Sequence, residues 1–193
     1  AKVDPFTFVL NGYGYYGGGY DGSSMLSTFY KYDPTSDTWT TLPNAPFAYN
    51  GTTSFVINGK GYVCTGQSMA GYHSDLWCYD PSSNSWTAKA AFPGSGRQDA
   101  CSFVINNIAY VGGGKPAGGT QTDWYKYDPS IDAWDTIASA PSGIKTARSF
   151  TCLNKGYIVG GFDDLNSPHN MLWCYDPTSN TWSVKASFPG NAR

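Results

Sequence analysis

The side chains best suited to bind a ligand are arginine, lysine, histidine, tyrosine and aspartate residues that fall between predicted strands. A guanidinium group pairs with a carboxylate through a planar fork of N–H groups, and aromatic faces suit sugar rings and cations. We therefore predict a loop face that binds a polar ligand such as a glycan or a peptide carboxylate. Its candidate residues are Arg97, Lys145, Arg148, Tyr49, Tyr72, His73, His169 and Asp99.

Structural roles compete with these binding roles. Arg97 and Arg148 could instead pair with acidic groups or backbone carbonyls of neighbouring repeats, and the sequence leaves both alternatives open. The two histidines, His73 and His169, stand 96 residues apart at equivalent positions. Two imidazoles without a third ligand nearby make a poor metal site, so we expect a turn role for them and neither metal nor cofactor.

The acidic residues argue against catalysis. The chain has no glutamate, and all 14 acidic residues are aspartates. This removes one common general acid or base and leaves Asp99, Asp163 and Asp164 as the available carboxyl groups near the loop face. The glycine runs end predicted strands with no helix after them, so they do not form a phosphate-binding loop. We expect a protein that is not an enzyme.

Composition excludes two classes of partner. Charged residues make up 13% of the 193 residues, the net charge is −2, and no basic run exists. We therefore expect no binding to nucleic acid or to an anionic membrane surface. No stretch approaches 18 apolar residues, so no membrane span is predicted. The five cysteines lack paired-ligand spacing, and we expect them to be small buried apolar residues.

An internal repeat dominates the sequence. The tripeptide Tyr-Asp-Pro begins at residues 32, 79, 127 and 175, and a tryptophan follows each tyrosine seven residues later, at Trp39, Trp86, Trp134 and Trp182. A period of this length is typical of solenoids and propellers. The second and fourth copies resemble each other most closely, as do the first and third, so a longer period of 96 residues indicates pairs of repeats.

Each repeat predicts four short strands. In the second copy they are expected near residues 53–57, 61–65, 75–79 and 85–89, with longer loops such as 67–74 at one end of the repeat. Asn58-Gly59 is typical of a two-residue hairpin turn, which needs positive φ at both positions. Four antiparallel strands in this order form one propeller blade.

The hydrophobic strand, the Gly-Gly pair, Tyr-Asp-Pro and the spaced tryptophan together resemble the kelch repeat along essentially the whole chain. The resemblance implies an all-β propeller of four kelch-type blades, each a four-stranded antiparallel sheet, that either closes alone or belongs to a larger ring. The first strand of each blade would be innermost and the fourth outermost. We expect a single domain over 1–193 with blades near 1–46, 47–93, 94–141 and 142–193.

The same resemblance guides the functional expectation. It indicates a non-catalytic binding module for a protein or glycan ligand, in a secreted or cell-surface protein similar to bacterial kelch proteins, with a homodimer as one way to complete a larger ring. Arg97 and Lys145 are expected at equivalent positions near the ring axis. The alternative is a carbohydrate-active kelch enzyme of the sialic-acid mutarotase or galactose-oxidase kind, although two histidines do not supply a copper radical site.

Overall fold

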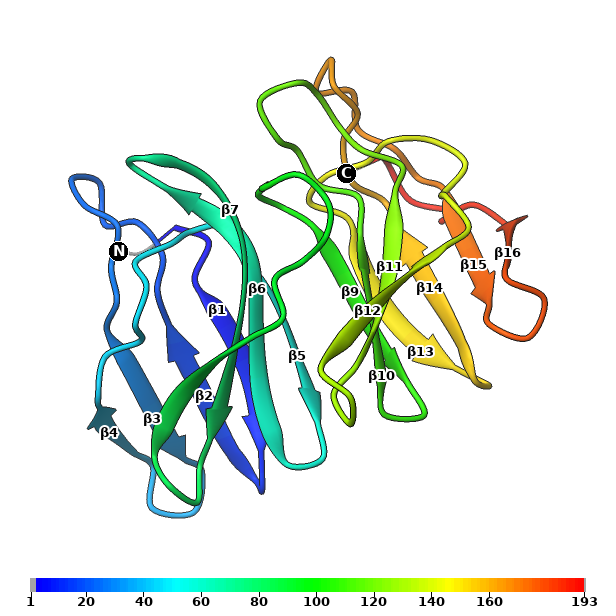
Figure 1. Ribbon diagram of the computed structural model, residues 1–193. Helices are drawn as coiled ribbons and strands as arrows, with labels where there is room; N and C mark the ends of the chain where they lie inside the picture. The colour runs from blue at the N-terminus through cyan, green and yellow to red at the C-terminus, as the bar shows by residue number, and fades with distance from the viewer. Residues whose placement is uncertain (1–2, 193) are drawn as a thin grey trace. The chain divides into compact units, whose positions relative to one another are not determined.

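The computed structural model describes residues 3–192, and every regular element in this range is a β-strand. The strands form four separate sheets of four antiparallel strands, and within each sheet neighbours in space are neighbours in sequence (Figure 1). The predicted all-β fold built of four blade-like sheets is confirmed. Within the described residues, no helix is long and apolar enough to cross a membrane.

The sheets fall into two compact units, residues 1–98 and 99–193. The first unit holds β1 (Phe6–Leu10), β2 (Tyr13–Gly17), β3 (Phe29–Asp33), β4 (Thr38–Leu42), β5 (Thr53–Ile57), β6 (Lys60–Ser68), β7 (Gly71–Asp80) and β8 (Ser85–Lys89). The second holds β9 (Cys101–Ile105), β10 (Ile108–Gly112), β11 (Trp124–Asp128), β12 (Ala133–Ile137), β13 (Arg148–Cys152), β14 (Lys155–Val159), β15 (Leu172–Asp176) and β16 (Thr181–Lys185). The blade limits and their union into one domain remain predictions.

One predicted loop is wrong. Residues 67–74 are largely strand, because β6 and β7 continue past a bulge between Cys64 and Gly66 and pair until Ser68 faces Gly71. A bulge takes up one extra residue and lets a ladder resume in register. The hairpin therefore carries Tyr72 and His73 on a strand instead of a loop.

Backbone geometry explains the recurring Asn-Gly and Gly-Gly sequences. Asn58 and Gly59 have φ of 51° and 72°, as the two-residue hairpin turn requires. At the ends of β2, β10 and β14, and at the bulge within β6, lie three residues that we call the glycine corner, at 17–19, 64–66, 112–114 and 159–161. Thr65 takes φ of 60° at the position where the other three corners have glycine, so the departure from Gly-Gly keeps the same backbone shape.

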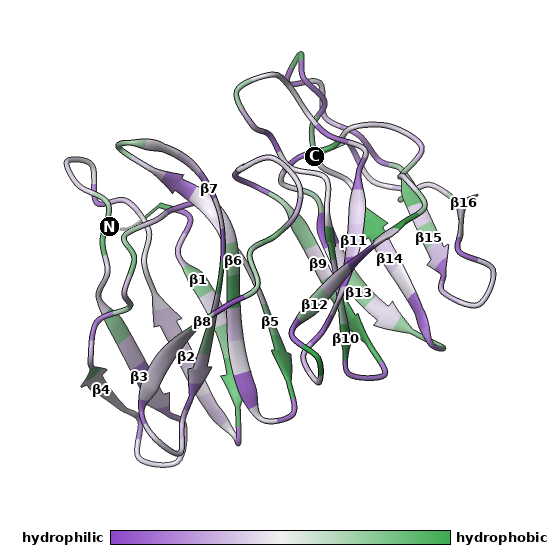
Figure 2. Ribbon diagram, viewed as in Figure 1, coloured by the Kyte–Doolittle hydropathy of each residue, from purple (hydrophilic) through white to green (hydrophobic). Residues whose placement is uncertain are grey.

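Neighbouring sheets within each unit meet through a ring placed against a glycine. The Phe8 ring lies so close to Gly61 that a Cβ added to this glycine would be 2.5 Å from it, and Phe103 lies in the same way against Gly156. Glycine is needed there for close approach, not for its φ. Around these contacts lie the two apolar cores, and Figure 2 shows the strands β5 and β10 as strongly apolar beside more polar turns.

Hydrogen bonds between first strands repeat along with the ring contact. The Ser54 hydroxyl donates to the Thr7 carbonyl at 2.7 Å in the first unit. In the second unit the Ser149 hydroxyl donates to the carbonyl of Ser102, and that of Thr151 donates to the carbonyl of Val104 at 2.8 Å. The same sheet-to-sheet contact is thus built twice from equivalent residues.

The ring on the first strand of the last sheet is not buried in this way. Phe150 occupies the strand position of Phe8 and Phe103, yet its side chain is 47% exposed, against 7% and 4% for the other two. Cys152 is likewise the exposed cysteine, whereas the free thiols of Cys64, Cys78, Cys101 and Cys174 are buried. The expectation of buried cysteines holds for these four and is wrong for Cys152.

Replacing Phe8 or Phe103 by alanine should lower the free energy of unfolding by about 3–5 kcal/mol, because each change empties a buried ring site. Phe150→Ala is the matched control, and its exposed ring should cost less than about 1 kcal/mol. Urea unfolding followed by tryptophan fluorescence measures all three. Equal losses at the three positions would contradict the burial pattern.

Candidate functional site

The glycine corners hold the chain segment that leads into the following sheet. At three of the four corners, the N–H of the last corner residue, a glycine, donates to the carbonyl of the residue four positions before the next first strand, which we call the entry residue. The pairs are Gly19 with Tyr49 at 2.8 Å, Gly66 with Arg97 at 2.7 Å and Gly114 with Ile144 at 2.8 Å.

These pairs correct the predicted equivalence of Arg97 and Lys145. The position equivalent to Arg97 is Ile144, because β9 and β13 begin at residues 101 and 148, one residue closer than the Tyr-Asp-Pro spacing suggests. Lys145 is the next residue. Its backbone pairs with Phe162, and its ammonium group donates to Asn166 Oδ1 at 2.6 Å.

Arg97 lies at the glycine corner formed by residues 64–66. Its side chain is fully buried, its guanidinium lies 4.8 Å from the centre of the Phe92 ring, and its Nε donates to the Ser95 carbonyl at 2.9 Å. Its N–H also donates to the His73 carbonyl at 3.1 Å. As placed, this arginine is covered and does not present its charge to a ligand.

Tyr49 and His73 come together in the first unit. Their rings stack with centres 4.1 Å apart and planes 16° apart, and the Tyr49 hydroxyl donates to Asp75 Oδ2 at 2.5 Å. Burial, together with this hydrogen bond to a carboxylate, raises the pKa of Tyr49 well above its usual value. Tyr72 lies in the same hairpin, paired with Gln67.

Ser68, His73 and Asp75 lie in the order of a serine-hydrolase relay but do not form one. Ser68 Oγ is 2.7 Å from His73 Nε2, which is a hydrogen bond. His73 Nδ1 is 3.9 Å from Asp75 Oδ2, which is longer than a hydrogen bond, and that oxygen already accepts the Tyr49 hydroxyl. The acid therefore does not orient the imidazole as a relay requires.

Asp99 has a backbone role at the start of a sheet. It takes φ of 58°, and Asp4, Gly51 and Thr146 share this left-handed conformation two residues before their own first strands. The Asp99 carbonyl accepts the Thr146 N–H at 3.2 Å, as the Asp4 carbonyl accepts that of Gly51 at 3.3 Å. Aspartate tolerates this conformation better than most residues.

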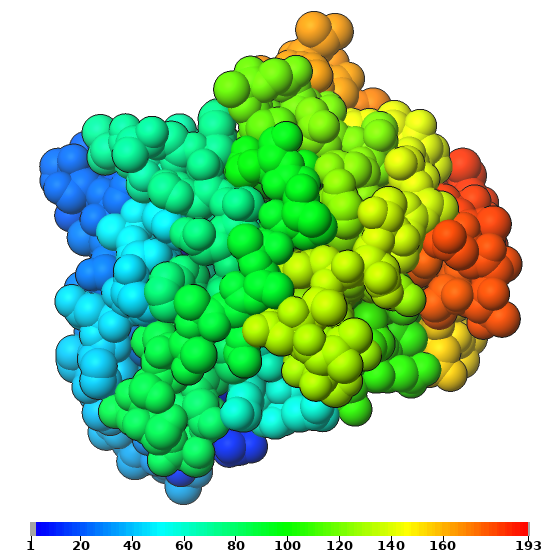
Figure 3. All heavy atoms as spheres, viewed as in Figure 1, coloured from blue at the N-terminus to red at the C-terminus, as the bar shows by residue number. Residues whose placement is uncertain are grey.

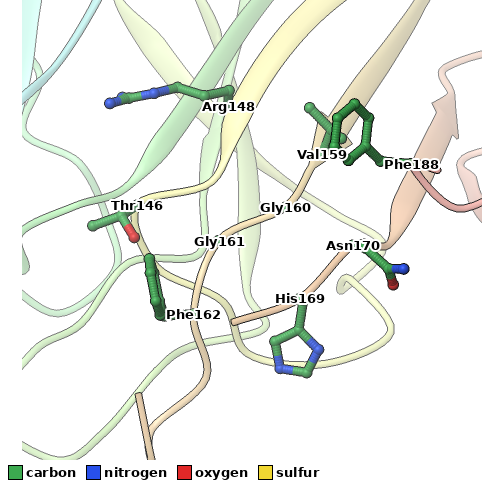
Figure 4. Close-up of a pocket in the computed structure, with 9 residues that line it drawn as sticks. All are labelled: Thr146, Arg148, Val159, Gly160, Gly161, Phe162, His169, Asn170 and Phe188. Atoms are coloured by element: carbon green, nitrogen blue, oxygen red, sulfur yellow. The ribbon is translucent and has the colours of Figure 1, made fainter. Parts of the chain in front are cut away.

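A pocket of about 460 Å³ opens at the loop end of the last sheet. Figure 4 shows the backbone of Gly160 and Gly161 crossing it, while the Arg148 guanidinium points away from its other lining side chains. The pocket brings together two of the predicted residues, Arg148 and His169. Its full lining is Thr146, Arg148, Val159, Gly160, Gly161, Phe162, His169, Asn170 and Phe188.

This pocket is the fourth glycine corner. Gly161 has φ of 92° and corresponds to Gly66, and Phe188 corresponds to Phe92 because both N–H groups donate at 2.8 Å to equivalent carbonyls, those of Asn170 and Ser74. Within residues 3–192 the Gly161 N–H has no acceptor, although Gly161 is itself buried. The position that corresponds to Arg97 at this corner is residue 193, which lies outside the described residues.

Among the residues that line this pocket, the sequence did not single out Gly160, Gly161, Asn170 or Phe188 as site residues. The signal that could have found them is the repeat itself, since Phe-Pro-Gly occurs at 92–94 and again at 188–190. Aligning these two copies would have marked 159–161 as the counterpart of the corner at 64–66.

Asp163 organises the loop beside the pocket. Its Oδ1 accepts the N–H groups of Leu165 and Ser167, both at 2.9 Å, and its Oδ2 lies 3.3 Å from His169 Nε2. The backbone bond from Ser167, with a smaller contribution from His169, lowers the pKa of this carboxyl. In Figure 3 the orange segment around residue 165 projects into solvent.

Among residues 3–192, no three His, Cys or Asp side chains cluster as metal ligands. The two histidines have separate partners, Ser68 for His73 and Asp163 for His169.

Comparison with known proteins identifies the class. The family model described as the KLHDC2/KLHL20/DRC7 Kelch-repeats domain matches residues 7–153, and the Kelch motif matches residues 154–189. The chain belongs to the kelch-repeat family, which confirms the resemblance in the sequence. A solved structure titled "Structure of YjhT" superposes with a TM-score of 0.84 over 99% of this chain and 72% of that one, at 18% identity. Curated protein sequences give no match.

The pKa of Asp163 predicts how the pocket loop responds to acid. Because the folded pKa is lowered, the carboxylate stabilises the loop fully above the usual value of 3.8 and loses this effect only as the pH falls below it. NMR titration should place the Asp163 midpoint below 3.8, with the Leu165 and Ser167 amides shifting over the same range. Asp163→Asn should abolish the transition, and a midpoint at or above 3.8 would refute the assignment.

Proposed function

We propose that this kelch-family chain is a non-catalytic interaction module, and that the pocket at residues 159–161 binds an extended segment of a protein partner. The observation that carries the proposal is the pocket at the fourth corner, as residues 3–192 define it. Three equivalent corners each hold an extended chain segment through the same glycine N–H, and the fourth offers the same buried donor with no acceptor among the described residues.

The other corners indicate the chemistry of the ligand. A ligand carbonyl would accept the Gly161 N–H, and a ligand N–H would donate to the His169 carbonyl, as Arg97 does with His73. Because the Arg148 guanidinium points away from the other side chains of the pocket, it is not placed to pair with a ligand carboxylate there, which favours main-chain recognition of a peptide.

The absence of glutamate and the broken Ser68, His73 and Asp75 relay support a binding role over the carbohydrate-active alternative. General acid–base catalysis needs an acid or base within hydrogen-bond distance of its partner, and both features reduce the groups that could serve in this way.

A peptide copied from residues 93–98, Pro-Gly-Ser-Gly-Arg-Gln, tests the proposal because this segment fills the equivalent corner. We expect saturable shifts of the Gly161 and His169 amides in two-dimensional NMR, with Gly66 unchanged since its N–H is already bonded. The same peptide with Arg97→Glu is the control.

No shift at Gly161 with saturating peptide would contradict the proposed peptide site. Shifts of the pocket amides by neutral oligosaccharides, with none from the peptide, would instead favour the glycan ligand.

A further inference from the structure

A second pocket, of about 380 Å³, opens between the third and fourth sheets, which both belong to the second unit. One wall consists of residues on β10, β11 and β12, and the other consists of residues on β15 and in the turn that follows it. This turn is remote from the corner at 159–161, because β15 begins beside Val159 and runs away from it to Asp176. The second pocket, which we call the Tyr110 pocket, is therefore separate from the proposed peptide site and shares no lining residue with it.

Three polar side chains stand in a row on the wall that the third sheet provides. Tyr110 pairs with Lys126, and Lys126 pairs with Asp135, so the three side chains lie on the same face of the sheet. That face is turned toward the fourth sheet, because the ring centre of Tyr110 lies 5.4 Å from that of Tyr175. The row thus brings a phenol, an ammonium group and a carboxylate to one wall of the pocket.

The Tyr110 hydroxyl is the group of this row that lacks a partner. The side chain is 6% exposed, and its position is fixed by a ring stack on Phe103 with centres 5.2 Å apart. Within residues 3–192 the hydroxyl makes no hydrogen bond. Burial raises the pKa of Tyr110, so the hydroxyl keeps its proton at neutral pH and can both donate and accept. Because a buried phenol group usually has a partner, its place on a pocket wall indicates a ligand with hydrogen-bonding groups.

Asn180 holds the two walls of the Tyr110 pocket together. Its Oδ1 accepts the Tyr175 hydroxyl from its own sheet and the Ala138 N–H from the third sheet, both at 2.9 Å. Since the oxygen is used in these two bonds, the side-chain NH2 group is left with two N–H donors that have no partner in the described part of the chain. Asn180 therefore fixes the separation of the walls and can donate a hydrogen bond to a ligand.

The two charged groups of the row offset each other. Lys126 Nζ lies 3.4 Å from Asp135 Oδ2, which is longer than the usual hydrogen bond, so both groups keep the capacity to bond elsewhere. A ligand hydroxyl can accept from the ammonium group and donate to the carboxylate at the same time. A charged ligand would instead be repelled by one of the two groups. This pair of charges therefore favours a neutral ligand with hydroxyl groups.

We propose that the Tyr110 pocket binds a neutral polyhydroxy compound of about the size of one sugar ring, with its hydroxyls on Tyr110, Lys126 and Asp135. The pocket volume lies within the range of small-molecule sites, roughly 300–1,000 Å³. The same hydroxyl chemistry occurs in a free sugar and at the end of a glycan chain. This inference goes beyond the proposed peptide site, and neither site depends on the other.

The other sheets lack this combination of groups. In the first unit Tyr15 pairs with Lys31, but Lys31 Nζ lies 4.6 Å from the centre of the Tyr13 ring, and no carboxylate stands beside it in the row. The corresponding rows of the other three sheets have, at the position of Asp135, the neutral residues Thr40, Thr87 and Ser183. The first sheet therefore supplies a matched control position within the same chain.

Two-dimensional NMR titration with glucose and galactose tests the proposal. We expect saturable shifts of the Tyr110 and Lys126 backbone amides and of the Asn180 side-chain amide, with the Tyr15 and Lys31 amides unchanged. Maltotriose and lactose, which end in these sugars, are titrated in the same way. Tighter binding of the oligosaccharides assigns the ligand to a glycan end, and equal or weaker binding assigns it to a free sugar.

Tyr110→Phe removes the hydroxyl and keeps the ring. It should weaken sugar binding about two- to tenfold, the loss expected for one hydrogen bond, without lowering the urea midpoint of unfolding, because the hydroxyl has no partner in the described chain. Tyr15→Phe is the matched control and should leave sugar affinity unchanged. Asp135→Asn should also weaken sugar binding, since it removes the carboxylate that accepts a ligand hydroxyl.

The absence of a saturable shift with any of the four sugars would overturn the proposal, as would sugar binding that is unchanged in Tyr110→Phe. Inorganic phosphate is the charged probe, and stronger shifts of the pocket amides by phosphate than by the sugars would overturn the neutral ligand. The peptide titration is followed separately at Gly161, which lies outside this pocket, so failure of one site is distinguished from failure of the other.

Discussion

An aromatic ring placed against a glycine of the next sheet is the contact on which this structure depends. Phe8 on Gly61 and Phe103 on Gly156 bring two backbones close enough for the first strands to exchange hydroxyl-to-carbonyl hydrogen bonds. Each contact buries an aromatic surface that a single four-stranded sheet cannot cover alone. The free energy that stabilises the fold thus lies mainly between sheets, in a unit that can be repeated.

The last sheet differs from the sheets before it at the positions that make these contacts. On the last sheet the side chains of Phe150 and Cys152 are exposed, and the Gly161 N–H has no acceptor among residues 3–192. The corner is already shaped to hold an extended chain, because three others do so with side chains as different as tyrosine, arginine and isoleucine. Recognition there would come from main-chain bonds, with the side chain tuning affinity.

Much of the fold could be predicted from sequence, because its signals are local. Asn58-Gly59 marks a turn that few other residue pairs can make, and the Tyr-Asp-Pro spacing gives the period directly. The hairpin at Ser68–Gly71 was missed because continued pairing beyond a bulge has no clear local signal. The family was also evident from the repeat, and its glycine, tyrosine and tryptophan positions proved to be packing positions.

The candidate site was harder to predict because it depends on contacts between repeats. Arg97 and Lys145 looked equivalent by counting from Tyr-Asp-Pro, yet a difference of one residue before β13 puts Ile144 in the corner and leaves Lys145 beside it. Burial of the Arg97 side chain could not be read from its position in the sequence. The pocket lining at Gly161 and Phe188 consists of residue types that sequence reasoning assigns to packing.

Amide hydrogen exchange of the four corner glycines tests the central claim most directly. If the entry residue of a following sheet holds each corner N–H, Gly19, Gly66 and Gly114 should exchange slowly, while Gly161 exchanges far faster and becomes protected when a peptide binds. Strong protection of Gly161 in the monomer, equal to that of Gly66, would contradict the open fourth corner and the function built on it.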